Sequence, residues 1–157
     1  MAKASNKGGS SKAANKKAYH DYLIIDKYEA GISLLGTEVK SIRAGQINLR
    51  DSFVGFSNGE AYLENAHISA YSHGNWTNHN PTRKRKLLLH ASEIKKLEKA
   101  VETKGITVVA LKLYEKRGIF KLEIATAKGK KLYDKRQTLK AKQDERDKER
   151  AFKDANR

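Results

Sequence analysis

The sequence predicts a mainly β fold with small helices, and three observations support this fold class. Short apolar runs separated by turn residues recur between residues 22 and 127, which is typical of antiparallel strands. Only residues 37–45 and 92–104 in this region carry apolar side chains at helical spacing. Both ends of the chain are rich in lysine and arginine and contain little that a core could bury.

The 157 residues suit one domain of about 100–150 residues with an arm at each end. Residues 1–18 have no periodicity and no bulky apolar run, so we expect a disordered basic arm there. Residues 19–128 form the folded domain. Residues 129–157 form a basic tail with opposite charges at helical spacing. Because an isolated helix of this kind is marginal in water, we expect the tail to be disordered when free and helical against phosphates.

The first elements of the domain are a strand and a short helix. Residues 22–35 predict a long strand that a bulge or bend at Gly31 curves. In the helix that follows, Thr37 can act as the N-cap, and Glu38 suits the positive end of the helix dipole. Gly45 ends this helix.

A hairpin comes next and is the clearest element. Residues 53–56 and 61–63 flank Asn58-Gly59, a dipeptide that two-residue hairpin turns prefer. Residues 65–71 continue as a further strand.

The last third of the domain is predicted to contain a helix and a second hairpin. A polar loop over residues 73–85 leads to a helix that Ser92 can cap. Residues 107–114 and 119–127 form the closing hairpin. Its inward set is Val109, Leu111 and Leu113 against Phe120, Leu122 and Ile124.

Together these elements favour a closed antiparallel β-barrel of the oligonucleotide-binding (OB) type with short packed helices, because a small core needs its sheet edges covered. An open antiparallel sheet with two packed helices is the alternative. Periodicity alone does not separate the two.

The charge indicates a polyanionic partner or an anionic surface. The net charge is +15, and residues 1–20 contain five lysines and no acidic residue. Basic arms are typical of nucleic-acid binding, although such arms can also serve only solubility. Seven Tyr, four Phe and one Trp are interleaved with the basic residues, and exposed rings can stack on bases. Tyr22, Trp76 and Tyr133 lie where exposure is expected.

Several classes of function lack support in the sequence. The absence of cysteine excludes disulfides, thiol catalysis and cysteine-ligated zinc. No apolar run reaches the ~20 residues of a membrane span, and the N-terminus lacks a signal-peptide core, so we expect a cytoplasmic protein without a membrane partner. No catalytic motif is found, so we expect no enzyme and no cofactor. The spacings of His67, His73, His79 and His90 match no helical pair of metal ligands, so no metal site is expected.

Four blocks carry a resemblance to a known family: residues 29–31 (EAG), 36–43 (GTEVKSIR), 80–90 (NPTRKRKLLLH) and 127–136 (AKGKKLYDKR). With these blocks in this order, the chain resembles the SmpB (small protein B) family of bacterial trans-translation. The resemblance runs from about residue 21 to residue 136 and continues in character through the charged tail.

The resemblance implies an OB-like barrel that binds RNA and catalyses nothing. It implies binding to the tRNA-like domain of transfer-messenger RNA (tmRNA, also called SsrA RNA) and delivery of that RNA to stalled ribosomes for rescue and peptide tagging. Further implied partners are the decoding centre and mRNA channel of the small ribosomal subunit. Alanyl-tRNA synthetase and elongation factor Tu with GTP are implied indirectly.

The resemblance also implies site residues. Glu29 is an acid in a basic protein, and it could accept hydrogen bonds from a base edge or a ribose hydroxyl. The tmRNA contacts that the resemblance implies are Tyr22, Glu29, Leu88, His90 and Lys121. We expect further contacts from basic residues within the matching blocks: Lys40, Arg43, Arg83, Arg85 and Lys86.

For the tail, the resemblance implies entry into the empty mRNA channel near the decoding centre. Gly129 would provide a bend, and Tyr133 would stack on a base of the decoding centre. The implied tail residues are Gly129, Lys130, Lys131, Tyr133, Asp134, Lys135 and Arg136.

Two other hypotheses remain open from the residues alone. A general single-strand RNA binder would show little preference for a folded tRNA-like shape. A small metal-dependent nuclease on an OB barrel would cleave RNA in the presence of a divalent ion.

Overall fold

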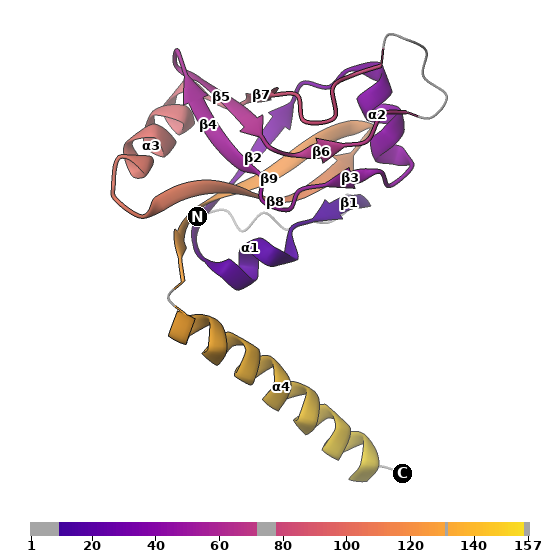
Figure 1. Ribbon diagram of the computed structural model, residues 1–157, viewed down its shortest axis with the longest axis vertical. Helices are drawn as coiled ribbons and strands as arrows, with labels where there is room; N and C mark the ends of the chain where they lie inside the picture. Colours follow the sequence, from indigo (N-terminus) through magenta and orange to yellow (C-terminus); the bar gives the residue numbers. More distant parts are fainter. Residues whose placement is uncertain (1–9, 72–77, 131, 156–157) are drawn as a thin grey trace.

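The computed structural model describes residues 10–71, 78–130 and 132–155. These residues form a mainly β body from which one long helix extends (Figure 1). The strands are β1 (Ser10–Ala14), β2 (Tyr22–Ile32), β3 (Ile47–Asn48), β4 (Phe53–Ser57), β5 (Glu60–Glu64), β6 (His67–Ile68), β7 (Arg85–Leu88), β8 (Ile106–Lys116) and β9 (Ile119–Gly129). The helices are α1 (Lys16–Asp21), α2 (Gly36–Arg43), α3 (Ala91–Val101) and α4 (Leu132–Ala155).

The larger sheet is antiparallel, and its pairings return to their starting strand. The order is β1-β8-β4-β5-β7-β2-β9, and β9 pairs again with β8. The strands from β8 through β9 therefore form a continuous cycle of pairings, while β3 and β6 form a separate small ladder. The predicted mainly β fold class with small helices is confirmed.

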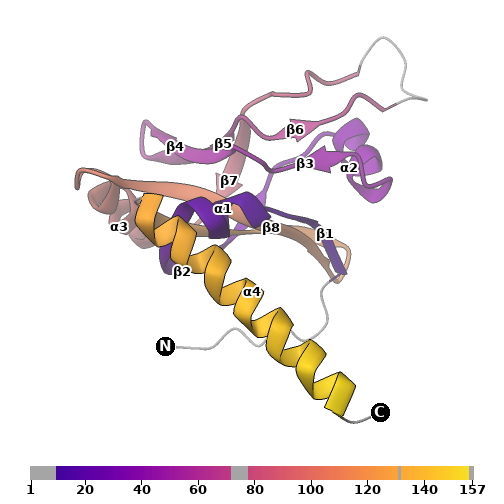
Figure 2. The same cartoon turned by 60° about the horizontal axis from the view of Figure 1, so that its bottom comes forward.

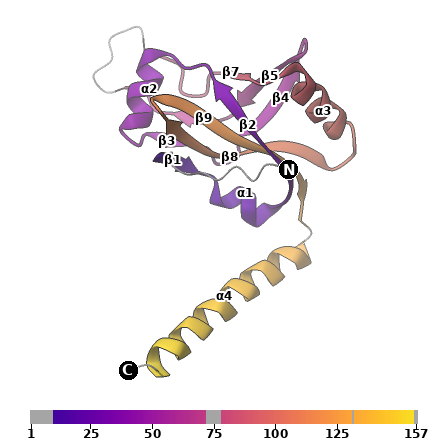
Figure 3. The ribbon, with the colours of Figure 1, turned by 180° about the vertical axis from the view of Figure 1, so that it is seen from behind.

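Strand β2 pairs with β9 and with β7, but over very different lengths. Figure 3 shows the three strands from behind. Strand β2 pairs with β9 over most of its length but with β7 only at Gly31 and Ile32. The register shift in β2 falls between Ile24 and Lys27, so the bulge predicted at Gly31 is wrong. Gly31 serves a close approach instead, because a Cβ at this position would lie 3.1 Å from the Cβ of Leu88.

Both predicted hairpins are confirmed, and their turns have the same backbone geometry. Asn58 (φ 52°) and Gly59 (φ 74°) join β4 to β5, and Arg117 (φ 52°) and Gly118 (φ 77°) join β8 to β9. Two successive left-handed residues are typical of type I′ turns, whose twist matches that of antiparallel strands.

The predicted inward face of the second hairpin is only partly correct. A register shift in β8 between Ala110 and Lys112 exchanges the two faces of the strand. Val109 and Leu111 consequently face a second apolar cluster beside α1, not the main core. Leu113, Phe120, Leu122 and Ile124 lie in the main core as predicted, joined by Val108 and Ala110.

The disorder predicted for residues 1–18 is wrong for residues 10–18, while residues 1–9 lie outside the described part of the chain. Strand β1 pairs with β8, and α1 packs against β8 (Figure 2). The buried amide of Asn15 donates to the carbonyls of Leu49 (3.1 Å) and Ala110 (2.9 Å) and accepts from the N–H of Ala18. The prediction looked for large apolar side chains at regular spacing. This segment is instead held by the hydrogen-bonded amide of Asn15 and by small buried side chains such as Ala18.

The predicted N-caps of α2 and α3 are also wrong. Both helices begin earlier than their hydroxyl residues, after Leu35 and His90. In each case the glutamate of the first turn bonds back to the preceding N–H: Glu38 to Leu35 (2.8 Å) and Glu93 to His90 (3.2 Å). The carboxylate half of a capping box thus replaces a Ser or Thr cap.

The junction between the body and the tail lies later than predicted. Gly129 is still paired with Tyr22 at the end of β9, and its φ is not positive. The bend at Gly129 that the resemblance implies for the ribosome-bound tail stays a prediction. The sequence predicts a tail that is disordered when free, whereas the structure has α4 as one continuous helix whose described side chains are exposed.

Within the described ranges, no helix is long and apolar enough to span a membrane.

Candidate nucleic-acid interface

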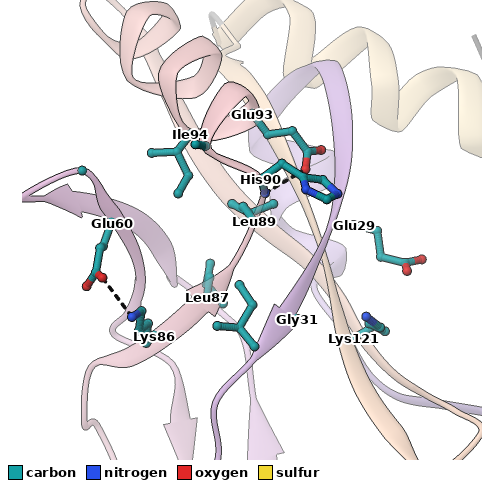
Figure 4. Close-up of a pocket in the computed structure, with 13 residues that line it drawn as sticks. Glu29, Gly31, Glu60, Lys86, Leu87, Leu89, His90, Glu93, Ile94 and Lys121 are labelled. Atoms are coloured by element: carbon teal, nitrogen blue, oxygen red, sulfur yellow. Dashed lines mark hydrogen bonds and ion pairs between the residues drawn. The ribbon is translucent and has the colours of Figure 1, made fainter.

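An open groove of about 710 Å³ lies where β2 and β7 diverge. Its walls come from the C-terminal end of β2, from β7, from the start of α3, from the β4–β5 turn and from β9 (Figure 4). Along β7 the side chains alternate, so Lys86 and Leu88 are exposed on the groove side while Arg85 and Leu87 are buried.

The structure brings half of the predicted tmRNA contacts together in this groove. They come from four separate elements or junctions of the fold: Lys86, Leu88 and His90 alternate along one stretch of sequence, whereas Glu29 and Lys121 are far from it in the chain. The five residues are Glu29, Lys86, Leu88, His90 and Lys121.

Two lysines of the groove differ in their partners. The Nζ of Lys86 lies 2.9 Å from Glu60 Oε1, so this cation is already paired. Among the described residues, Lys121 has no carboxylate within ion-pair distance. Lys121 is therefore the cation of this groove that is available to an incoming anion.

The carboxylate of Glu29 is held by a neutral donor. Tyr114 is 5% exposed, and its hydroxyl donates a hydrogen bond to Glu29 Oε2. Burial raises the pKa of Tyr114, and the hydrogen bond and negative charge of Glu29 raise this pKa further. Tyr114 consequently stays protonated at neutral pH and remains a donor to Glu29.

Arg85 is not available to RNA, which corrects its predicted role. Its side chain is fully buried, and it donates to Glu38 Oε2 (2.5 Å) and to the carbonyls of Ala66 (2.9 Å) and Pro81 (3.0 Å). Glu38 is equally buried, and its other oxygen accepts from Arg83 at 2.6 Å. Arg85 therefore joins β7 to α2 inside the body.

The pKa of Glu38 reflects two opposing effects. Burial alone would raise the pKa of this carboxyl, but hydrogen bonds from Arg83, from the N–H of Leu35 and from Arg85 lower it below its usual value. The carboxylate is therefore charged at neutral pH and compensates the buried guanidinium of Arg85.

The remaining predicted contacts in the body lie outside the groove. Tyr22 begins β2, opposite Gly129. Arg83 is partly exposed and paired with Glu38. On α2, the ammonium of Lys40 lies 5.5 Å from the centre of the Tyr71 ring, and Arg43 lies 3.2 Å from Glu115 and 5.8 Å from the centre of the Phe120 ring.

The tail residues divide between the junction and the helix. Lys130 is fastened to the body, because its N–H donates to the carbonyl of Asp21 (2.8 Å) and its Nζ donates to the carbonyl of Tyr19 (3.2 Å). Lys131 lies outside the described residues, as does Trp76. The remaining predicted tail residues, Tyr133, Asp134, Lys135 and Arg136, lie in the first turns of α4.

Sequence reasoning missed Tyr114, Glu60 and Glu93, which support or line the groove. A signal for Tyr114 exists, since period-two alternation places it on the same outward face of β8 as Lys112. Its partner Glu29 is distant in the chain, and only the pairing of β9 with both β8 and β2 brings the two residues together.

The histidines do not form a metal site in the part of the chain that the structure describes, where no three His, Asp or Glu side chains gather suitably. His79 is buried between Thr37 Oγ1 (2.8 Å) and the carbonyl of Ile68 (2.8 Å). Because a carbonyl only accepts, Nε2 of His79 carries a proton, and this ring connects α2 to β6.

Comparison with known proteins identifies the family of this chain. The family model described as SmpB protein matches residues 12–154. The chain therefore belongs to the SmpB family.

Individual relatives are similar over most of their length. The SsrA-binding protein of Streptomyces avermitilis is 59% identical over 92% of this chain and 82% of its own. That of Geotalea uraniireducens is 57% identical over 91% of this chain and 95% of its own. A chain of a solved structure described as "tmRNA-SmpB: a journey to the center of the bacterial ribosome" superposes with a TM-score of 0.66 at 50% identity, covering 76% of this chain and 85% of that one.

Proposed function

We propose that this chain binds the tRNA-like domain of tmRNA and delivers that RNA to stalled ribosomes for trans-translation in the cytoplasm. The observation that carries the proposal is the groove between β2 and β7. Residues that the family resemblance assigns to tmRNA contact, although dispersed in the sequence, gather there on one surface. The family membership of the chain supports the choice of RNA.

The chemistry of the groove suits a folded RNA. Lys121, which has no carboxylate partner in the described part of the chain, offers its ammonium to a phosphate. Leu88 is 58% exposed and offers an apolar surface to a base or a ribose. Glu29 offers an acceptor to a base edge or a ribose hydroxyl, which a phosphate cannot use. A groove with these three features can select a particular RNA surface as well as attract a polyanion.

The body is further proposed to be a closed barrel of the OB type. The cycle of strand pairings from β8 through β9 supports closure, because it leaves the principal strands paired on both sides. Tyr22, Lys40, Arg43 and Arg83 are proposed as additional RNA contacts outside the groove.

Residues 129–157 are proposed to act on the ribosome, in the empty mRNA channel near the decoding centre. Tyr133 would stack on a base, and Lys131, Lys135 and Arg136 would meet phosphates. Lys130 has a different place in this proposal, since its bonds to the end of α1 support an anchoring role. The role is binding and delivery without a catalytic step, and alanyl-tRNA synthetase and elongation factor Tu with GTP would act on the same RNA.

The RNA partner is tested by recovering the protein from cells in moderate salt and sizing the bound RNA. We expect one dominant RNA with a tRNA-like end that accepts alanine. A mixture of RNAs without a dominant species would contradict the proposal and favour a general single-strand binder.

The division between body and tail is tested with a chain that ends at Lys130, which retains all of β9 and the bonds to α1. We expect nearly unchanged affinity for the tRNA-like domain and loss of peptide tagging. Equal loss of both activities would contradict the division.

A further inference from the structure

Two carboxylates face each other across β2 and β9, yet their surroundings differ. Glu29 is directly opposite Glu123 in the register of the two strands. Like charges in this position are unfavourable unless cations compensate them. Glu123 lies 3.4 Å from the ammonium of Lys27 and 3.7 Å from that of Lys112. Among the described residues Glu29 has no such cation, and its observed partner is the hydroxyl of Tyr114.

Tyr114 is itself held firmly. Its side chain is buried, and the ammonium of Lys112 lies 5.4 Å from the centre of its ring. Tyr114 is also directly opposite Lys121 in the register of β8 and β9, and Lys121 is directly opposite Gly31 of β2. The phenol is therefore held next to two residues that line the groove: its hydroxyl bonds to Glu29, and its strand neighbour is Lys121. Figure 4 shows Glu29 and Lys121 in the groove.

We propose that Tyr114 is a positioning residue, which fixes the carboxylate of Glu29 through Oε2 so that Oε1 faces the RNA as an oriented acceptor. This inference rests on the proposed function of the groove. A lysine in place of Tyr114 would neutralise Glu29, whereas a phenol orients the carboxylate and leaves its negative charge in place. The retained charge repels phosphates and favours hydroxyl or amino donors, so Tyr114 contributes to selectivity more than to total affinity.

The test is a double-mutant cycle on equilibrium binding. The full-length protein and the variants Tyr114→Phe, Glu29→Ala and the double substitution are titrated with the tRNA-like domain and with an unstructured oligonucleotide of equal length. Selectivity is the ratio of the two dissociation constants. Tyr62→Phe is the matched control, because Tyr62 donates to Glu60 (2.8 Å), which Lys86 already neutralises.

We expect Glu29→Ala to lower the selectivity about tenfold and Tyr114→Phe about fivefold, which is the range for the loss of one ordinary hydrogen bond. The double variant should be no worse than Glu29→Ala, and Tyr62→Phe should change the ratio less than about twofold. Melting temperatures of all variants separate these effects from unfolding.

The outcomes distinguish a failure of the proposed function from a failure of the positioning role of Tyr114. If the wild-type protein has no preference for the tRNA-like domain, both the proposed function and the role of Tyr114 are overturned. If the preference exists but Tyr114→Phe retains it, or if the effects of Tyr114→Phe and Glu29→Ala simply add, only the positioning role is overturned.

Discussion

The groove and helix α4 differ in how far the core of the protein supports them. The groove residues stand on strands and a helix whose other faces lie in the main core. Helix α4 has 24 residues, and its described side chains are exposed (Figure 3). Within α4, the side chain of Gln143 donates a hydrogen bond to Asp147 (3.0 Å), one helical turn away. Tertiary contacts therefore determine the shape of the groove, whereas α4 approaches the body at α1 and otherwise depends mainly on interactions within its own sequence.

This difference suits two kinds of recognition. A surface fixed by a core is already organised for one partner and loses little conformational entropy on binding. A helix without packing is marginal in water, so its population responds to whatever surrounds it. If the proposed function holds, the body identifies the RNA, and the tail reports whether its site on the ribosome is empty.

The largest expected effect is a loss of stability in the body from a substitution that does not touch the tail. Glu38→Ala removes the carboxylate that compensates the buried guanidinium of Arg85. Leaving a buried charge without its partner costs about 3–5 kcal/mol, so we expect a comparable drop in the free energy of unfolding. Chemical denaturation followed by the fluorescence of the body measures it.

The matched control for Glu38→Ala is Asp51→Asn, which removes the exposed ion pair with Lys17 (2.6 Å). We expect only a small change there, since exposed pairs contribute little. Similar decreases in the free energy of unfolding for both variants would show that the buried pair stabilises the body no more than an exposed pair does.

The lowered pKa of Glu38 also predicts a smaller effect, a dependence of the unfolding free energy on pH in the acid range. Because the folded state lowers the pKa of Glu38, its contribution to stability is present above its unfolded pKa of about 4.3 and is lost as the pH falls through the lower folded pKa. Glu38→Gln lacks this contribution at every pH. The difference in unfolding free energy between the wild type and Glu38→Gln should therefore be constant near neutrality and shrink below about pH 4. A difference that does not depend on pH would contradict the lowered pKa.

The sequence predicted those parts of the fold that depend on neighbouring residues. The turn at Asn58-Gly59 and the apolar alternation of β9 suffice locally, and both were predicted correctly. Arg83, Arg85 and Lys86 were all predicted to contact RNA. Strand alternation turns Arg85 inward, where it bonds to Glu38, a residue that was predicted only to interact with the helix dipole.

The remaining errors have a common physical cause. Asn15, Gly31 and Tyr114 each take their role from a residue far away in the chain: a distant carbonyl, a neighbouring strand or a distant carboxylate. Half of the implied RNA contacts nevertheless meet in one groove. The family resemblance supplied those residues, and periodicity would not have found them.

The next effect is a loss of helix in α4 from substitutions that do not touch the body. Ala141→Gly and Ala151→Gly lie in α4, and each should destabilise the helix by about 1 kcal/mol. We expect a lower far-ultraviolet helical signal and an unchanged melting temperature of the body. A matched Ala→Ser pair at the same positions should have a weaker effect. A shift in the melting of the body would show that α4 packs against it in solution.

The smallest effect concerns one charge of the groove. Lys121→Gln removes the ammonium that has no carboxylate partner among the described residues. A single lost phosphate contact should weaken binding to the tRNA-like domain about three- to tenfold at low salt and reduce the salt dependence by about one unit of slope. Lys86→Gln is the control, because the ammonium of Lys86 is already paired with Glu60 and its loss should change the slope less. Equal slopes for both variants would mean that RNA binding breaks the pair between Lys86 and Glu60. The two sides of the groove would then contribute alike to attraction, and selectivity would depend on Glu29 and its neighbours.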